Sequence, residues 1–170
     1  AMNPSCMIDG PSQFDFYSGG GLDIAFLGFG EIDAVGNVNV SKLGGNTVGP
    51  GGFIDIAQNA RKVVFCGTFD TGGARTEVGS GVMRVTEHGR VSKLVDKVDQ
   101  ITFSGPQSLL QGQKVIYITE RAVFELRENG LHIIEIAPGI DLQTDLLDRM
   151  GFVPKMNSPL SEMDNNYFKK

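Results

Sequence analysis

The chain has 170 residues, enough for a single domain, since domains usually contain about 100 to 200 residues. Its 41% hydrophobic and 21% charged residues are close to a globular average and exclude a chain that is disordered or fibrous throughout. Its 20 acidic and 15 basic residues give a net charge of −5, which leaves no basic field to hold a nucleic-acid backbone.

The first half of the chain predicts two buried strands separated by a helix. Residues 22–27 form an apolar run bounded by glycines, typical of a strand covered on both faces. Residues 31–40 alternate around Gly36-Asn37 and predict a hairpin or a turn between two short extended segments. A short helix over 53–60 leads into a second apolar strand at 62–69. Because a helix separates the two strands, we predict that they are parallel and joined by a crossover.

The second half predicts mainly antiparallel strands. Residues 75–103 alternate as in a half-exposed ribbon, and strands are predicted at 115–119, 122–126 and 131–136. Asp141 can cap a final helix that ends at Gly151, with apolar residues at helical spacing between them. We expect residues 2–153 to form the domain and the polar residues 154–170 to form a C-terminal tail that frays.

Membrane insertion and export are not predicted. The longest strongly apolar stretch, residues 24–29, is far shorter than the roughly 18 residues needed to cross a bilayer, and no basic flank precedes an apolar block near the N-terminus. We interpret Ala1 as a residue left by cloning and expect the natural chain to begin at Met2. These features lead us to expect a soluble, cytoplasmic protein that binds neither membrane nor nucleic acid.

The cysteines and histidines do not form a recognisable metal site. Cys6 and Cys66 have no C-x-x-C spacing, and Cys66 lies in the apolar run 63–66, which favours a buried reduced thiol over a disulfide or a metal ligand. His88 and His132 offer no zinc-binding pair and no Ser-His-Asp relay, and we interpret both as structural. We therefore predict no metal and no resident cofactor.

Glycine is about twice as frequent as usual: 23 of the 170 residues are glycine, whereas the average is near 7%. The segment Gly49-Pro50-Gly51-Gly52 is followed by Phe53 and lacks the Lys-Ser/Thr of a nucleotide-binding P-loop. A glycine loop that enters a helix nevertheless presents free backbone N–H groups to a carbonyl oxygen, an oxyanion or a phosphate. A close-packed turn is the alternative interpretation of the same loop.

Six blocks in this order resemble family I coenzyme A transferases. The blocks are residues 13–28, 36–41, 49–54, 62–69, 113–124 and 135–142, and the resemblance covers about 7–152. It looks closest to single-chain acetate or propionate CoA-transferases, with the beta subunits of 3-oxoacid CoA-transferases as more distant relatives. The resemblance implies an α/β fold with an open, mostly parallel sheet of the NagB/RpiA-like type and an antiparallel ribbon, of which this chain would be the C-terminal half-lobe.

The resemblance also implies a chemistry. In the family, a glutamate carboxylate attacks an acyl-CoA and forms a glutamyl-CoA thioester by ping-pong covalent catalysis. That glutamate lies in an E-x-G-x-x-G motif before the segment matching residues 13–17, so the resemblance places no catalytic residue in this chain. It assigns Gly52, with Gly51 beside it, to the oxyanion and CoA-binding loop. Coenzyme A is implied as a substrate and not as a cofactor.

Three Glu-x-Gly triplets were considered as substitutes for the missing motif. They begin at Glu77, Glu87 and Glu128. The position that needs the second glycine holds Val82, Ser92 and Ile133, respectively. All three triplets fall at predicted turns, where a solvated acidic residue beside a glycine is ordinary. We therefore do not predict a nucleophile among them.

Two functions remain open at this point. The first is part of a short-chain acyl-CoA:carboxylate CoA-transferase that supplies the glycine loop and acts with an upstream lobe or subunit. The second is a non-catalytic ligand-binding or interaction protein derived from the same fold. In either case we expect the chain to form homo-oligomers, because a half-lobe leaves strand edges and apolar faces uncovered.

Overall fold

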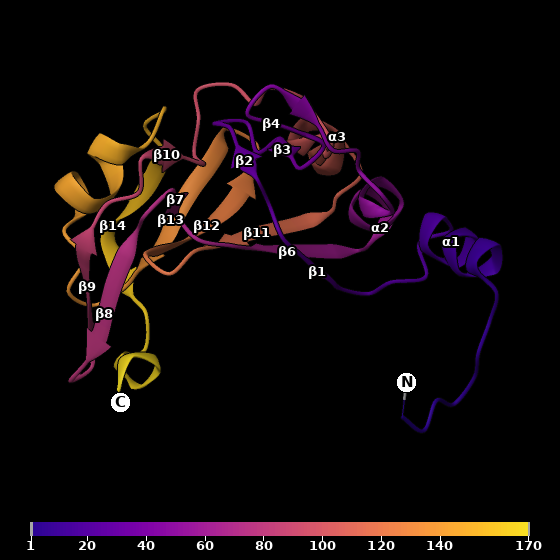
Figure 1. Ribbon diagram of the computed structural model, residues 1–170, viewed down its shortest axis with the longest axis horizontal. Helices are drawn as coiled ribbons and strands as arrows, with labels where there is room; N and C mark the ends of the chain where they lie inside the picture. The colour runs from indigo at the N-terminus through magenta and orange to yellow at the C-terminus, as the bar shows by residue number, and fades with distance from the viewer. Residues whose placement is uncertain (1, 170) are drawn as a thin grey trace.

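The structure is a computed structural model that describes residues 2–169, and it centres on one mixed sheet (Figure 1). The six strands follow the order β1-β6-β11-β12-β13-β14. Their bounds are β1 Ala25–Leu27, β6 Lys62–Cys66, β11 Lys114–Ile118, β12 Ala122–Arg127, β13 Gly130–Ile136 and β14 Lys155–Glu162. The β1–β6, β6–β11 and β13–β14 pairs are parallel, and β11–β12 and β12–β13 are antiparallel. The predicted α/β class with a mostly parallel sheet is confirmed.

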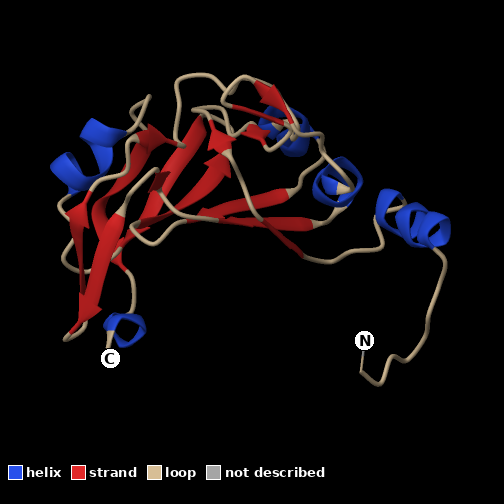
Figure 2. Cartoon of the chain, viewed as in Figure 1, coloured by secondary structure: helices blue, strands red, loops and turns tan. Residues whose placement is uncertain are grey.

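Short ribbons and helices surround the sheet (Figure 2). The pairs β2–β3, β4–β5, β7–β10 and β8–β9 form two-stranded ribbons. Their bounds are β2 Glu31–Ile32, β3 Val38–Asn39, β4 Lys42–Leu43, β5 Asn46–Thr47, β7 Asp70–Thr71, β8 Arg75–Gly79, β9 Val82–Glu87 and β10 Val91–Ser92. The helices are α1 Gly10–Ser18, α2 Phe53–Asn59, α3 Gly105–Leu110, η1 Leu142–Leu146, η2 Leu147–Arg149 and η3 Asn165–Phe168. None of the helices among residues 2–169 combines the length and hydrophobicity needed to span a bilayer.

The predicted parallel crossover is confirmed. Phe26 of β1 lies beside Val64 of β6, which in turn lies beside Ile116 of β11. The chain passes from β1 through two ribbons and the glycine loop into α2 before it enters β6. The predicted hairpin at Gly36-Asn37 is also present as β2–β3, and Gly36 adopts a φ of 80° that favours glycine.

The core lies on one face of the sheet. The ring of Phe65 stacks on Phe53 of α2 at 5.8 Å and on Tyr117 of β11 at 5.3 Å, and it meets Phe103 edge-on at 5.0 Å. The Tyr117 hydroxyl donates to the Gly36 carbonyl oxygen at 2.6 Å. Burial raises the pKa of Tyr117 well above its usual value, and the charge of Asp33 raises it further, so the hydroxyl keeps the proton that it donates. This contact fixes the β2–β3 hairpin over the sheet.

The opposite face of β1 and β6 is partly open, since Val64 is buried there but Phe26 and Cys66 are exposed, and this corrects two predictions. The first strand is not covered on both faces, because Phe26 is 66% exposed. Cys66 is a free but exposed thiol, not a buried one, because it points away from the face on which its neighbour Phe65 is buried. An apolar run in the sequence therefore does not by itself show that a strand is buried on both faces.

The C-terminal segment is ordered, which corrects the prediction that it frays. β14 pairs in parallel with β13 over residues such as Ile133 and Met156, and η3 follows it. The Phe168 side chain of η3 is 7% exposed and packs with Met83 and Ala137. An edge strand is held mainly by backbone hydrogen bonds, so the polar side chains of this segment did not indicate that it forms a strand.

The predicted cap at Asp141 is confirmed, although the segment after it is not a regular α-helix. The Asp141 carboxylate accepts from the backbone N–H groups of Gln143 at 3.0 Å and Thr144 at 2.8 Å. These hydrogen bonds lower the pKa of Asp141. The capped segment is the π-helical turn η1 followed by the 3₁₀ turn η2. The sequence analysis missed α1 and α3, which are short and lack strong helical periodicity.

Replacing Phe168 with alanine should loosen the C-terminal segment. Loss of a buried phenyl ring typically costs about 3 kcal/mol or more. The Gly81 amide, which donates to the Phe168 carbonyl oxygen at 3.1 Å, should then exchange its hydrogen with solvent at least tenfold faster. The control is Tyr167→Ala, since Tyr167 is 77% exposed. Equal exchange rates in the two variants would show that Phe168 does not anchor the segment.

Candidate functional site

The carboxyl ends of three parallel strands lie side by side, and residues from each following segment meet there. Phe29 follows β1, Gly67 follows β6 and Glu120 follows β11. In open α/β sheets, ligands bind in the crevice outside the carboxyl ends of the strands. This edge is therefore a candidate site.

Lys93 is the cation at this edge. Its side chain is nearly buried, with the residue 9% exposed, and its Nζ lies 3.9 Å from the centre of the Phe29 ring. A Cβ on Gly67 would lie 3.0 Å from the same Nζ, so glycine leaves the space that the ammonium occupies. Burial lowers the pKa of Lys93, and the nearby negative charge of Glu120 acts in the opposite direction. Within residues 2–169, the ammonium has no hydrogen-bond acceptor and no ion-pair partner within 4 Å.

A cavity of about 220 Å³ adjoins this edge. Lys93, Thr68, Thr71 and Ser92 line it with polar groups. The remaining lining residues are Gly30, Glu31, Leu43, Gly44 and Val91. The cavity is too small for a nucleotide-sized ligand but has room for a small molecule that combines a polar and an apolar part.

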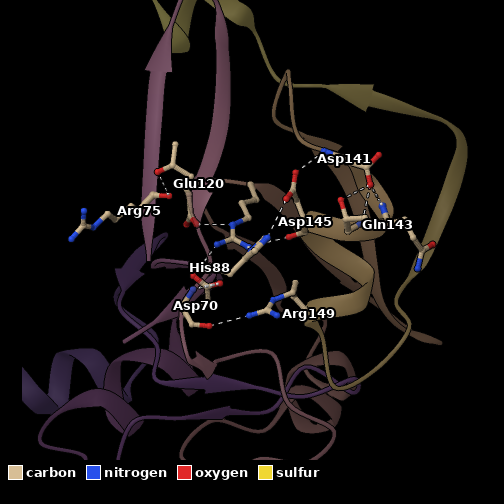
Figure 3. Close-up of polar contacts among 12 residues, drawn as sticks. Asp70, Arg75, His88, Glu120, Asp141, Gln143, Asp145 and Arg149 are labelled. Atoms are coloured by element: carbon tan, nitrogen blue, oxygen red, sulfur yellow. Dashed lines mark hydrogen bonds and ion pairs between the residues drawn. The ribbon is translucent and has the colours of Figure 1, made fainter. Parts of the chain in front are cut away.

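Glu120 and Arg121 connect this edge to a buried cluster of charged side chains (Figure 3). The Glu120 carboxylate accepts from the Phe69 amide at 2.8 Å and from the Arg121 Nε at 3.2 Å. Arg121 is fully buried, and its Nη2 lies 2.8 Å from the Asp70 Oδ1. Its guanidinium also lies over the Phe69 ring, with the Cζ 4.5 Å from the ring centre. Asp70 in turn accepts from the Gly89 amide at 3.0 Å.

Two further residues complete this cluster. The Arg121 Nη1 donates to the Asp145 backbone oxygen at 3.0 Å, and the His88 Nε2 lies 3.5 Å from the Asp145 Oδ1. Figure 3 shows Asp70, His88 and Asp145 gathered from three separate segments of the chain. The sequence analysis missed this cluster. Its only sequence signal was the charged pair Glu120-Arg121 between two strongly apolar strands.

The glycine loop precedes α2, beside α1. Gly51 has a φ of 54°, and Gly52 follows with a φ of −84° at the start of the helix. A Cβ on Gly52 would lie 2.5 Å from the Cε1 of Phe14, so the loop packs closely against α1. Neither amide donates a hydrogen bond to another group within the described residues. The structure therefore leaves both N–H groups free.

Only one of the three Glu-x-Gly triplets begins at a turn, that of Glu128, whereas the Glu77 triplet lies within β8 and Glu87 ends β9. Glu77 and Glu87 are exposed on the β8–β9 ribbon, at the opposite end of the molecule from α2 in Figure 1. Glu87 pairs with Arg75 at 3.4 Å on the surface. Glu128 is exposed at the β12–β13 turn beside a cavity of about 270 Å³. No group of three or more potential metal ligands lies together among residues 2–169.

Known CoA-transferases resemble the chain over nearly its whole length. The acetate CoA-transferase YdiF of Escherichia coli K12 is 50% identical over 167 residues, which is 98% of this chain. The caffeate CoA-transferase of Acetobacterium woodii is 46% identical over 173 residues, covering 99% of this chain. The crystal structure of the acyl-CoA transferase YdiF apoenzyme from Escherichia coli O157:H7 matches 98% of the chain with a TM-score of 0.95, as does its thioester complex with CoA. No protein-family model matches the chain.

The chain spans about one third of these relatives, 32% of YdiF and 33% of the caffeate CoA-transferase. Over that third, the chain is similar to YdiF both in sequence and in fold. The resemblance to CoA-transferases predicted from the six sequence blocks is thereby confirmed, and so is the predicted CoA-transferase type of fold.

Breaking the buried ion pair should destabilise the whole domain. We expect Asp70→Asn to lower the free energy of unfolding by about 3 kcal/mol, because Arg121 would lose a charged partner in a site closed to water. The control is Glu87→Gln, which removes an exposed ion pair and should cost about 0.5 kcal/mol or less. Urea unfolding of both variants measures the difference. Similar losses in the two variants would contradict a central role for the Arg121 cluster.

Proposed function

We propose that this chain is part of a short-chain acyl-CoA:carboxylate CoA-transferase. The observation that supports the proposal is the match of 98% of the chain, at 50% identity and a TM-score of 0.95, to an acyl-CoA transferase that has been crystallised as a thioester complex with CoA. Because the chain corresponds to one third of that protein, we propose a contribution to the reaction and not the complete reaction.

In this proposal the glycine loop stabilises negative charge on the acyl group. Attack on a thioester carbonyl places a negative charge on its oxygen in the transition state, and fixed N–H donors lower the energy of that state. The free amides of Gly51 and Gly52 supply such donors. Close packing of Gly52 against Phe14 would hold the loop still, so that little reorganisation is needed during the reaction.

The nucleophile in this proposal lies outside the 170 residues. The motif E-x-G-x-x-G does not occur in the printed sequence, and each of the three Glu-x-Gly triplets lacks the second glycine. A carboxylate from an upstream lobe or subunit would attack the acyl-CoA and release CoA thiolate, leaving an acyl anhydride. The thiolate would then attack the anhydride at the enzyme carbonyl, releasing the acid and forming an enzyme thioester. An acceptor acid would finally take the CoA.

The chain alone should therefore show no turnover with acetyl-CoA and a short carboxylate. Activity should appear when a polypeptide carrying the upstream lobe and its glutamate is added. In that assembly, Glu128→Gln should leave the rate nearly unchanged, because Glu128 lies exposed at the β12–β13 turn. Turnover by the chain alone, or a glutamyl-CoA adduct that mass spectrometry maps to Glu128, would contradict the proposal.

The role of the Gly52 amide can be separated from its packing. Any side chain at position 52 would collide with Phe14, so both variants are made in a Phe14→Ala background. Gly52→Pro removes the N–H group, whereas Gly52→Ala retains it. We expect the proline variant of the active assembly to turn over about a hundredfold more slowly than the alanine variant, as for one lost oxyanion donor. Equal rates would show that the loop is only a close-packed turn.

The open face of the sheet supports association with another polypeptide. Phe26, Cys66 and Ile118 are exposed on this face, and β1 lies at the edge of the sheet. In Figure 2 the helices α2 and α3 lie on the other side of β6 and β11. An apolar face and an unpaired strand edge are surfaces that pair with other chains. We propose that the upstream lobe covers them in the active enzyme, and that copies of this chain associate through them in its absence.

Removing the exposed phenyl ring should weaken this association. We expect the isolated chain to form oligomers in light scattering as its concentration rises, and Phe26→Ser to shift the onset to at least tenfold higher concentration. The control is Val153→Ser, since Val153 is 80% exposed but lies outside the strands. A monodisperse monomer over a wide concentration range would contradict the prediction.

A further inference from the structure

Lys93 is buried, and among the described residues its ammonium has neither an ion-pair partner nor a hydrogen-bond acceptor. Lysine is almost never fully buried unless it is paired, since removing an ammonium from water is costly. Here the ammonium contacts the face of the Phe29 ring, and Glu120 acts on it only at longer range. The Glu120 carboxylate is already engaged by the Phe69 amide and Arg121. The fold thus keeps a largely buried cation for which residues 2–169 provide no acceptor.

The neighbouring cavity shows what kind of molecule would fit. It begins at Thr68, directly after the glycine that the Lys93 ammonium approaches, and Lys93 is one of its lining residues. The hydroxyl groups of Thr68 and Thr71 can donate hydrogen bonds, whereas Leu43 contributes apolar surface. A volume of about 220 Å³ admits a small acid with a few carbon atoms and excludes coenzyme A itself.

We propose that Lys93 binds the carboxylate of a short-chain acid at the carboxyl edge of β1 and β6, with the acid's alkyl part in the adjoining cavity. The choice of a short-chain acid rests on the proposed transferase function, in which such an acid is a substrate. Lys93 would hold the acid in place, and we assign it no part in bond making or breaking. A dianion such as phosphate fits less well, because the site offers one cation and lies in the negative field of Glu120.

Binding can be measured on the 170-residue chain without any turnover. We would titrate lysine-labelled protein with acetate, butyrate and inorganic phosphate at constant ionic strength, and follow the Lys93 side-chain resonances by NMR. The two carboxylates should give saturable shifts of Lys93, and phosphate should not. Lys93→Met should weaken acetate binding at least tenfold, as followed at the backbone amides of Thr68 and Ser92. The matched control is Lys62→Met, at the amino end of the same strand β6, which should change the affinity less than twofold.

The outcomes separate this inference from the transferase proposal. Saturable carboxylate binding that depends on Lys93 supports the inference even where an assembled enzyme shows no transfer of CoA. An absence of saturable shifts, unchanged affinity in Lys93→Met, or equally tight binding of phosphate would overturn it, even where transfer of CoA is observed. Lys93→Arg keeps the charge and should retain part of the affinity, which distinguishes loss of the cation from a general change in folding. Circular dichroism and urea unfolding check that each variant is folded.

Discussion

The buried guanidinium of Arg121 is the constraint on which the carboxyl edge of the parallel strands depends. A cation that is wholly removed from water must be paired, and its partners must be held in fixed positions. Asp70 and Glu120 provide the charges, and Glu120 in turn accepts from the Phe69 amide in the segment that follows β6. Because these partners come from separate segments, one side chain fixes the loops after β6 and β11 relative to each other. The same network places the negative charge that acts on Lys93.

One face of the sheet is covered by packed side chains, and the other is partly exposed. Phe65 and Tyr117 bury their rings against α2 and the β2–β3 hairpin, whereas Phe26 and Ile118 remain exposed on the opposite face. In a chain that matches about one third of its relatives, such a face is the natural contact for the remaining polypeptide. The proposed reaction is shared in the same way between this chain and the remaining polypeptide. This chain supplies hydrogen-bond donors and a binding cavity, whereas the nucleophile lies in the other part.

The positions of the main strands along the chain and of several turns could be predicted from the sequence, because both depend on local patterns. Near-continuous apolar residues at 62–69 predicted a buried strand, of which residues 62–66 form β6, and the intervening helix predicted that it runs parallel to β1. The capping side chain of Asp141 was likewise visible in the sequence. The burial of Cys66 and the fraying of the C-terminal segment were predicted wrongly, since burial depends on what packs above each face and an edge strand such as β14 depends on backbone pairing.

The sequence by itself determined the class of fold, the resemblance to CoA-transferases and the glycine loop before α2, because each rests on short segments that can be recognised one by one along the chain. Only the tertiary structure decided that Lys93, Phe29 and Gly67 meet at one edge, and that Arg121 gathers Asp70, His88 and Asp145 around it. These residues are dozens of positions apart and carry no shared motif. The parallel pairing of β1, β6 and β11 brings together the segments of Phe29, Gly67, Asp70 and Arg121, and the Ile32 amide, which donates to the Lys93 carbonyl oxygen, places Lys93 beside them.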